Sequence, residues 1–363
     1  MRGVHITRFA ALDGNGRPSK TLLPIRQVLR LENLAEHQAI GANKIRVETH
    51  YAGVQYPDFL QAKGLYQIKP QLPYVPGMDS AGVVVGKGSN VNRFRIGDRV
   101  LVNTALCKDG QGGTGALAEK VTVSQEACFP VPDDLPLHSV SNIGRNYCAA
   151  YHALKVLGDV SRGDLVLVDG ASGGVGMATV ELAKAMGCHV IAGVSSESKA
   201  QFPGQAGADR VLVYGRTKES YTNFKVDAKQ AAKELGHSQG ATLVVDVVNG
   251  ELFDALVSCV KPLGTICLVG FTAGQRPIRP GLLLIKEVRV VGSLWGRWAR
   301  ENPVQFSNNM KEILAIVQGQ KSGSSACIYP LEQIVDAFEL FEQNKSRGNT
   351  VIAFPAANRK SKL

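Results

Sequence analysis

A phosphate-binding turn is indicated by the run Gly170-Ala171-Ser172-Gly173-Gly174-Val175-Gly176. The run follows the apolar segment 164–169 and precedes the apolar-periodic segment 175–187. Between a strand and a helix, glycines let backbone N–H groups approach a phosphate, and the helix dipole favours its negative charge. The spacing is G-x-x-G-x-x-G, which an ordinary tight turn also permits, so the flanking elements must support the interpretation. We predict a dinucleotide pyrophosphate site made by Gly170, Ser172, Gly173, Gly174, Val175 and Gly176.

Six segments rich in Val, Ile and Leu support this interpretation, because such runs are typical of strands buried on both faces. The intervals between the first five are long enough for crossover helices. This count predicts an α/β fold with a doubly wound Rossmann domain. The six segments are 164–169, 189–194, 211–213, 241–248, 264–270 and 288–295.

The end of the second predicted strand favours NADPH over NADH. Sites that prefer NAD place Asp or Glu there to bind the ribose 2′-hydroxyl. Here Ser195 and Ser196 follow the strand and leave room for a 2′-phosphate. Glu197 argues the other way, and comparison of the two Michaelis constants decides between the cofactors. The residues that we expect near the 2′-phosphate are Ser195, Ser196, Lys199, Tyr214 and Arg216.

The N-terminal part of the chain has a different pattern, with short strands bounded by Gly or Pro. The segments 44–49, 80–85, 98–102 and 119–123 predict a compact β barrel or sandwich. Helices are predicted over 139–157, 304–319 and 331–343, and a final strand over 350–354 returns to the barrel. We therefore expect a substrate domain of residues 1–137 and 297–363 around a nucleotide domain of residues 138–296.

The bulk composition is that of an ordinary globular chain. It has 363 residues, 44% of them hydrophobic, and no run of about eighteen apolar residues, so no membrane span is expected. The N-terminus lacks the apolar core of a signal peptide. Seven scattered cysteines without a C-x-x-C pair indicate free thiols in a reducing compartment. The net charge of +10 suits anionic ligands, while the absence of a nucleic-acid-binding signature argues against nucleic acid as a partner.

The residues Ser361-Lys362-Leu363 form a peroxisomal import address, which a receptor reads. They follow a polar tail. The sequence therefore predicts an import receptor as a partner and a location in the peroxisome or a related organelle such as the glycosome. Without that import the expected location is the cytoplasm.

Five stretches resemble the medium-chain dehydrogenase/reductase superfamily. Residues 73–85, 94–100 and 113–123 resemble its N-terminal signature, whereas 151–154 and 170–176 resemble its quinone oxidoreductase branch, which is zinc-independent. The resemblance runs from about residue 25 to 354. It implies a GroES-like β barrel domain plus a doubly wound Rossmann domain, an active site in the cleft between the two, and a homodimer or homotetramer.

The resemblance also implies that no metal is bound. Zinc-dependent alcohol dehydrogenases of this superfamily hold catalytic zinc with a Cys and a His in the motifs corresponding to 54–58 and 76–79. The matching positions here are Gln55 and Met78, and neither an amide nor a thioether replaces those ligands. The cysteine lobe that holds structural zinc is also missing, because only Cys107 falls in that region.

Candidate catalytic residues follow from the same resemblance, and they are Gln55, Tyr56 and Tyr66. Many quinone oxidoreductases have Asn at the position of Gln55, and Gln keeps the amide donor and acceptor. The phenols of Tyr56 and Tyr66 could donate to a developing enolate or hydroquinone oxygen. The alternative for each tyrosine is a packing role with its hydroxyl bonded to backbone. Further cofactor contacts are expected at Gly270, Phe271, Leu294, Trp295, Lys345 and Arg347.

Two classes of function remain open from the sequence. The first is an NADPH-dependent oxidoreductase that transfers hydride to a quinone or an α,β-unsaturated carbonyl compound, including a peroxisomal enoyl thioester. The second is a non-catalytic protein that binds NADPH or interacts with RNA. NADPH oxidation with a panel of quinones, alkenals and enoyl thioesters separates the two.

Overall fold

The chain folds into two compact units. The computed structural model describes residues 1–12, 22–35, 39–107, 115–320 and 326–358. The barrel unit comprises Met1–Arg145 and Gln320–Leu363, and the Rossmann unit comprises Asn146–Gly319. The boundaries differ from the expected ones because α9 (Trp295–Glu301) and α10 (Pro303–Gly319) fold with the Rossmann unit. There α10 packs against α3 (Cys148–Tyr151) and α4 (Gly174–Ala185).

The barrel unit contains a sheet in the order β14-β15-β3-β4-β5-β7, with β6 paired to β3. Alternation of apolar residues on β3 and β4 directs Ile45, Val47 and Val84 into a buried cluster. All four strands predicted in the N-terminal part are present. The strands are β3 (Lys44–Val54), β4 (Asp79–Lys87), β5 (Arg99–Asn103), β6 (Lys120–Ser124), β7 (Cys128–Pro130), β14 (Ala326–Pro330) and β15 (Asn349–Ala353).

The C-terminal segment completes this unit. Strand β15 pairs antiparallel with β3, with Thr350 opposite Val54, which confirms the predicted return. Strand β14 was not predicted, and it pairs with β15 in parallel. A small second sheet consists of β1 (Arg2–Ile6) and β2 (Leu29–Asn33).

Two helices of the barrel unit share a hydrophobic core and an ion pair. Phe59 of α1 (Tyr56–Lys63) and Phe338 of α11 (Ile334–Glu342) belong to the same buried cluster. The Lys63 Nζ lies 2.6 Å from Glu342 Oε1, and the Lys63 side chain is only 6% exposed. This pairing fixes α1, whose first turn follows Gln55.

The Rossmann unit contains a six-stranded sheet in the order β10-β9-β8-β11-β12-β13. Every pairing is parallel, and the chain order along the sheet is 3-2-1-4-5-6, as predicted for a doubly wound fold. The order reverses between β8 and β11, which makes this the switch point. The strands are β8 (Leu165–Val168), β9 (His189–Val194), β10 (Arg210–Val213), β11 (Ala241–Asp246), β12 (Val260–Leu268) and β13 (Arg289–Gly292).

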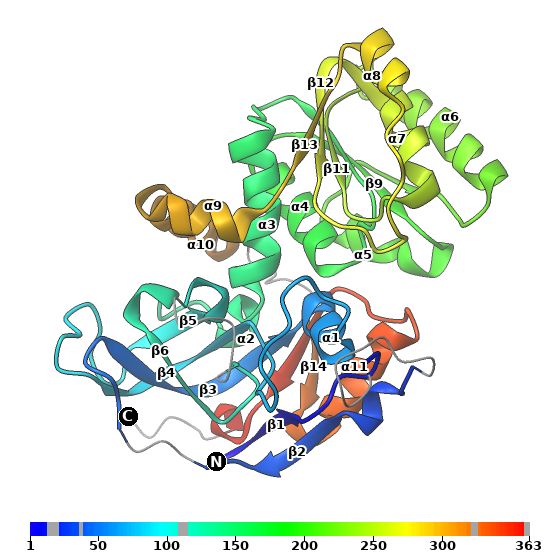
Figure 1. Cartoon of the computed structure of the whole chain (residues 1–363). Coiled ribbons are helices and arrows are strands. Elements are labelled where there is room, and N and C mark those ends of the chain that lie inside the picture. Colours follow the sequence, from blue (N-terminus) through cyan, green and yellow to red (C-terminus); the bar gives the residue numbers. More distant parts are fainter. Residues whose placement is uncertain (13–21, 36–38, 108–114, 321–325, 359–363) are drawn as a thin grey trace. The chain divides into compact units, whose positions relative to one another are not determined.

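Helices cover both faces of this sheet (Figure 1). On one face α4 packs against β8 and β9, and on the other α6 and α7 pack against β9 to β12. Figure 1 shows α3 and α4 on the side of the sheet opposite to α6 and α7. The remaining helices are α5 (Gln201–Gln205), α6 (Lys218–Glu234), α7 (Phe253–Cys259) and α8 (Pro280–Lys286).

The helix predicted over 139–157 is interrupted. It consists of α2 (Leu137–Val140), a π-helical turn at Ile143–Tyr147, α3, and a second π-helical turn at His152–Leu157. The boundary between the two units falls within the first π-helical turn. In the part of the chain that the structure describes, no helix combines the length and the apolar character needed to cross a bilayer.

Candidate functional site

The glycine turn lies at the carboxyl end of β8, next to the switch point of the sheet. Gly170 has a φ of +58°, which favours glycine, and its carbonyl accepts from the N–H of Gly173. Gly173 is the N-cap of α4, and Ser172 and Gly176 are buried while Gly173, Gly174 and Val175 are partly exposed. The first N–H groups of a helix lack partners within the helix, so this turn presents donors to an anion.

Two of the glycines allow close packing around the turn. A Cβ atom at Gly176 would lie 2.4 Å from the carbonyl oxygen of Gly170, and one at Gly174 would lie 2.2 Å from Nδ2 of Asn146. A larger residue at Gly176 would therefore displace the turn, whereas one at Gly174 would displace the Asn146 side chain. This cradle fits the pyrophosphate of a dinucleotide, as the sequence predicts.

The residues predicted for the 2′-phosphate gather at the ends of β9 and β10. The Tyr214 N–H donates to Val194 O, so the segment containing Tyr214 lies beside the end of β9. Ser195, Ser196 and Lys199 are partly exposed, and Arg216 is exposed. Tyr214 itself is buried against Phe224, and burial raises the pKa of its phenol. The side chains of Ser195, Ser196 and Lys199 are thus accessible to a ligand, whereas the ring of Tyr214 is buried.

The residues predicted on the nicotinamide side divide into exposed and buried ones. Phe271 is 44% exposed and Leu294 is 61% exposed, and Gly270 donates its N–H to the carbonyl of Asp246. Trp295 is only 7% exposed, and its ring stacks on Phe306 with centroids 6.0 Å apart. The Trp295 ring thus packs α9 against α10, and its contact with the cofactor stays a prediction.

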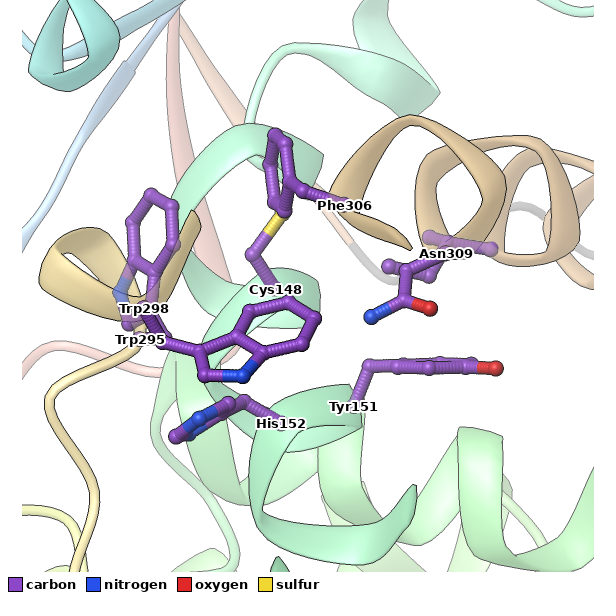
Figure 2. Close-up of a pocket in the computed structure, with 8 residues that line it drawn as sticks. Cys148, Tyr151, His152, Trp295, Trp298, Phe306 and Asn309 are labelled. Atoms are coloured by element: carbon purple, nitrogen blue, oxygen red, sulfur yellow. The ribbon is translucent and has the colours of Figure 1, made fainter. Parts of the chain in front are cut away.

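A small pocket adjoins Trp295 (Figure 2). It is lined by Cys148, Tyr151, His152, Trp295, Trp298, Phe306, Asn309 and Ile313. Its cavity volume is about 10 Å³, far below the roughly 300–1,000 Å³ of typical ligand sites. Burial lowers the pKa of His152 to about 4, and its Nδ1 lies 2.9 Å from Ser293 Oγ. The pocket is therefore a feature of helix packing.

A pair of buried carboxyl groups lies at the switch point, and the sequence interpretation missed it. Asp169 precedes Gly170, and Asp246 ends the neighbouring strand β11. Both are completely buried. The signal was present in the sequence, since each Asp follows directly on an apolar strand, where charged residues are costly to bury.

In the barrel unit, Gln55 is held by two polar side chains. Its Nε2 donates to Asp79 Oδ2 at 2.7 Å and to Asn142 Oδ1 at 3.3 Å. Its Oε1 is buried and has no hydrogen-bond partner among the described residues. Asp79 and Asn142 therefore fix the orientation of the amide, and both of its N–H groups are used.

The carboxyl groups near Gln55 resist ionisation. Burial raises the pKa of Asp79 to about 8 and that of Asp58 to about 7, and the charge of Arg145 opposes both shifts. Asp58 Oδ2 also accepts from the backbone N–H of Gln55. No sequence pattern predicts this cluster, because Asp58, Asp79 and Arg145 are far apart along the chain.

The two predicted tyrosines occupy different surroundings. Tyr56 packs with Phe59 and Phe341, with ring centroids 5.8 and 6.5 Å away, and burial raises the pKa of its phenol. Tyr66 is partly exposed, and its hydroxyl oxygen accepts a hydrogen bond from Nη2 of Arg145. Of the two, Tyr66 is the one placed to present a hydroxyl group. Their catalytic roles stay predictions.

The position that corresponds to the zinc-binding His is held by Met78, which is 4% exposed. Among the described residues no group of three or more His, Cys, Asp or Glu side chains could hold a metal ion. The absence of zinc stays a prediction for metal measurement on purified protein.

The last two predicted nucleotide contacts lie in the barrel unit. Lys345 and Arg347 belong to the barrel unit, where both are exposed after α11. Their contact with a nucleotide stays a prediction. The import address Ser361-Lys362-Leu363 falls outside the residues that the structure describes.

Comparison with known proteins agrees with this architecture. The model of the alcohol dehydrogenase GroES-like domain matches residues 41–133, and that of the zinc-binding dehydrogenase matches residues 174–315. The quinone oxidoreductase-like protein 2 homolog of Nematostella vectensis is 32% identical over 328 residues, which cover 89% of this chain and 85% of that protein.

Solved structures show the same fold. A probable oxidoreductase from Mycobacterium abscessus has a TM-score of 0.80 and 26% identity, with coverage of 97% of this chain and 99% of the other. A mycobacterial protein solved in complex with NADPH has a TM-score of 0.80 and 25% identity, with coverage of 97% and 100%.

A GroES-like barrel and a doubly wound sheet with a glycine turn at its switch point define a medium-chain dehydrogenase/reductase. Within that superfamily the chain belongs to the zinc-independent quinone oxidoreductase family, and it is an oxidoreductase that acts on small molecules. The predicted family and fold are confirmed.

Proposed function

We propose that this protein is an NADPH-dependent, zinc-independent reductase of quinones or α,β-unsaturated carbonyl compounds. The observation that carries the proposal is the glycine turn, which joins β8 to the N-terminus of α4 at the switch point. When bound, NADPH supplies the hydride. Gly173, Gly174 and Val175 would bind the pyrophosphate through backbone N–H groups.

The end of β9 supports NADPH as the cofactor. Ser195 and Ser196 leave space for a 2′-phosphate, and Lys199 ends the 3-10 turn Glu197–Lys199 that follows them. The mycobacterial structure with NADPH at 25% identity is in line with this choice. Glu197 is exposed and one residue beyond the serines, so it does not occupy the usual position of an NAD-selecting carboxylate.

The barrel unit supplies polar groups for the acceptor. During reduction the acceptor gains hydride at one carbon, and its carbonyl oxygen takes up the electron pair. Tyr66 is suited to donate a hydrogen bond to that oxygen, because Arg145 already occupies the acceptor side of its hydroxyl. Gln55, whose amide is held by Asp79 and Asn142, stays the second candidate for orienting the acceptor. The final proton comes from solvent.

The acceptor class is decided by turnover. NADPH oxidation is measured at 340 nm with flat quinones, with short alkenals and with enoyl-CoA thioesters. Turnover of at least one class supports the proposal, and the class with the highest kcat/KM identifies the acceptor. Failure with every class, together with tight binding of NADPH and RNA, would establish the non-catalytic alternative.

A homo-oligomer is proposed from the edge of the Rossmann sheet. Strand β13 ends the sheet, and among the described strands it pairs only with β12. Nearby, Leu263, Leu284 and Ile285 are 70%, 79% and 82% exposed, and the Leu263 N–H donates to the carbonyl of Glu287 at the end of α8. An open strand flanked by exposed apolar side chains is suited to pair with the same strand of a second copy.

Import into the peroxisome or glycosome through Ser361, Lys362 and Leu363 is proposed from the sequence alone. Enoyl thioester reduction is compatible with that location. A fluorescent protein fused to the last twelve residues is expected in punctate organelles, and diffuse cytosolic fluorescence would contradict the proposal.

A further inference from the structure

Two completely buried carboxyl groups meet at the switch point of the Rossmann sheet. Asp169 follows β8 and Asp246 ends β11, and these strands are parallel neighbours in which Val168 pairs with Val245. The backbone N–H of Asp169 donates to the carbonyl of Val245, so the two acids come at neighbouring positions of adjacent strands, and the charge of Asp246 adds to burial in raising the pKa of Asp169. Two neighbouring carboxyl groups inside a protein do not both ionise at neutral pH, so the pair shares one proton.

Each member of the pair also holds the loop after β11. Asp169 Oδ1 accepts from the backbone N–H groups of Val247 at 2.6 Å and Val248 at 3.3 Å. Asp246 accepts from the backbone N–H of Asn249 at 2.6 Å and from its Nδ2 at 2.8 Å. Asn249 has a φ of +57°, which is uncommon outside glycine, so these bonds stabilise a strained conformation.

The same loop connects two segments assigned to the nucleotide. On one side Val248 Cγ2 would lie 3.1 Å from a Cβ atom at Gly170, so the loop packs against the glycine turn. On the other side Asn249 Oδ1 accepts from the N–H of Arg276 at 2.8 Å, and the Asp246 carbonyl accepts from Gly270. The carboxyl pair is therefore bonded, directly or through one residue, to both segments.

The surroundings determine which carboxyl group keeps the proton. Burial, then the neighbouring charge of Asp246, raises the pKa of Asp169 well above its usual range. Burial raises the pKa of Asp246 as well, but hydrogen bonds from Asn249 oppose that shift. Asp169 is the acid and Asp246 the carboxylate.

The other titratable groups that face the pair come from the neighbouring elements. Tyr214 follows β10 and faces Asp169, and Cys267 of β12 faces Asp246. Burial raises the pKa of Cys267 to about 12 and that of Tyr214 above its ordinary value. Tyr221 of α6 faces Tyr214. Because burial holds the pKa values of Tyr214 and Cys267 above their ordinary values, neither group masks titration of the pair.

We propose that Asp169 and Asp246 are positioning residues for nucleotide binding, which hold the glycine turn and the segments 247–249 and 270–276 together through one shared proton. The proposal rests on the proposed NADPH-dependent function. Removal of the proton leaves two neighbouring negative charges in the interior and adds charge beside a site that takes phosphates. NADPH affinity is therefore linked to the protonation of this pair.

The test measures the dissociation constant of NADPH alone, without an acceptor, by calorimetry between pH 7 and 9.5. The 2′-phosphate has finished titrating in this range, since its second pKa is about 6. For the wild-type protein the dissociation constant should rise fivefold or more across the range. Asp169→Asn keeps a donor toward Asp246 and an acceptor toward Val247, and it cannot ionise. This variant should bind NADPH as the wild type does at pH 7 and show less than a twofold change up to pH 9.5.

Two further variants make the outcome decisive. Asp246→Asn removes the neighbouring charge from Asp169, so the pH dependence of NADPH affinity should be weaker than in the wild type, and this variant replaces Asp169→Asn if the latter does not fold. The control Asp164→Asn changes a carboxyl group at the other end of β8, and it should keep the wild-type pH profile. Folding of each variant is checked by thermal unfolding without ligand.

The possible failures are distinguishable. A wild-type affinity that does not change with pH, or folded Asp169→Asn and Asp246→Asn proteins that keep the wild-type profile, would overturn this inference and leave the proposed function intact. A wild-type protein that does not bind NADPH at any pH would overturn both.

Discussion

Gln55 Nε2 lies 2.7 Å from Asp79 Oδ2, and both residues are buried in the barrel unit. This contact fixes the orientation of the amide, whose Oε1 is also buried. The residue that the sequence identifies as a catalytic candidate is thus oriented by a carboxyl group 24 positions away, whose own protonation is set by burial.

Replacement of Asp79 by Asn should change the pH dependence of stability. The pKa of Asp79 is raised from 3.8 to about 8, so the folded protein keeps a proton that the unfolded chain releases. Stability from this group is complete below pH 3.8 and is lost as the pH rises towards 8, by up to about 1.4 kcal/mol per pH unit. Asp79→Asn removes this loss, so its melting temperature relative to wild type should increase from pH 5 to pH 8. The exposed Asp133→Asn is the control, and parallel curves for both variants would contradict the assignment.

Replacement of Gly176 by Ala should disrupt nucleotide binding. The added Cβ would lie 2.4 Å from the carbonyl oxygen of Gly170, so the glycine turn must shift. We expect the dissociation constant of NADPH to rise at least tenfold, about 1.4 kcal/mol. Gly281→Ala is the matched control, because a Cβ at that helical position meets nothing within 4 Å. Equal affinities of the two variants in a fluorescence titration would rule out the turn as the binding site.

Replacement of Lys199 by Ala should weaken NADPH binding and leave NADH binding unchanged. A positive charge near the 2′-phosphate contributes only to the phosphorylated cofactor. We expect the KM for NADPH to rise roughly tenfold, which corresponds to about 1.4 kcal/mol. Lys229→Ala, at an exposed position of α6, should alter neither constant. A parallel loss of affinity for both cofactors would place Lys199 outside the 2′-phosphate site.

Replacement of Tyr66 by Phe should lower kcat and leave NADPH binding unchanged. The variant loses the hydroxyl group that Arg145 orients, and with it a hydrogen bond to the oxygen that gains charge. Loss of one such donor predicts a decrease in kcat of roughly 100- to 1,000-fold. Tyr329→Phe, in β14 of the same unit, is the control. Unchanged kcat in Tyr66→Phe with the best acceptor would exclude this role.

Replacement of Leu284 and Ile285 by Lys should dissociate the proposed oligomer. The two side chains are 79% and 82% exposed next to the edge strand, and charges there would have to be buried on association. Light scattering with size-exclusion chromatography should show the wild type as a multiple of 38.8 kDa and the double variant as a monomer. Val226→Lys on α6 is the control. A monomeric wild type, or an unchanged mass in the double variant, would contradict the interface.

The local features of the fold could be predicted because they depend on residues close in sequence. The apolar runs of β8 and β9, the glycine turn and the periodicity of α4 define a nucleotide-binding unit without tertiary information. The return of β15 to the barrel could be predicted from its position after the last Rossmann strand. The break in the 139–157 helix could not, because its π-helical turns have no sequence pattern that distinguishes them from an ordinary helix.

Local sequence was enough to predict the class of the protein and the glycine turn proposed to hold its cofactor, since strand periodicity and glycine spacing are local properties. Which polar groups meet depends on the packing of segments that are distant in the chain. This packing brings Asp169 to Asp246, Gln55 to Asp79 and Arg145 to Tyr66. The physical reason is that strand pairing and helix docking set these distances, and burial at those places then sets the protonation of each carboxyl group.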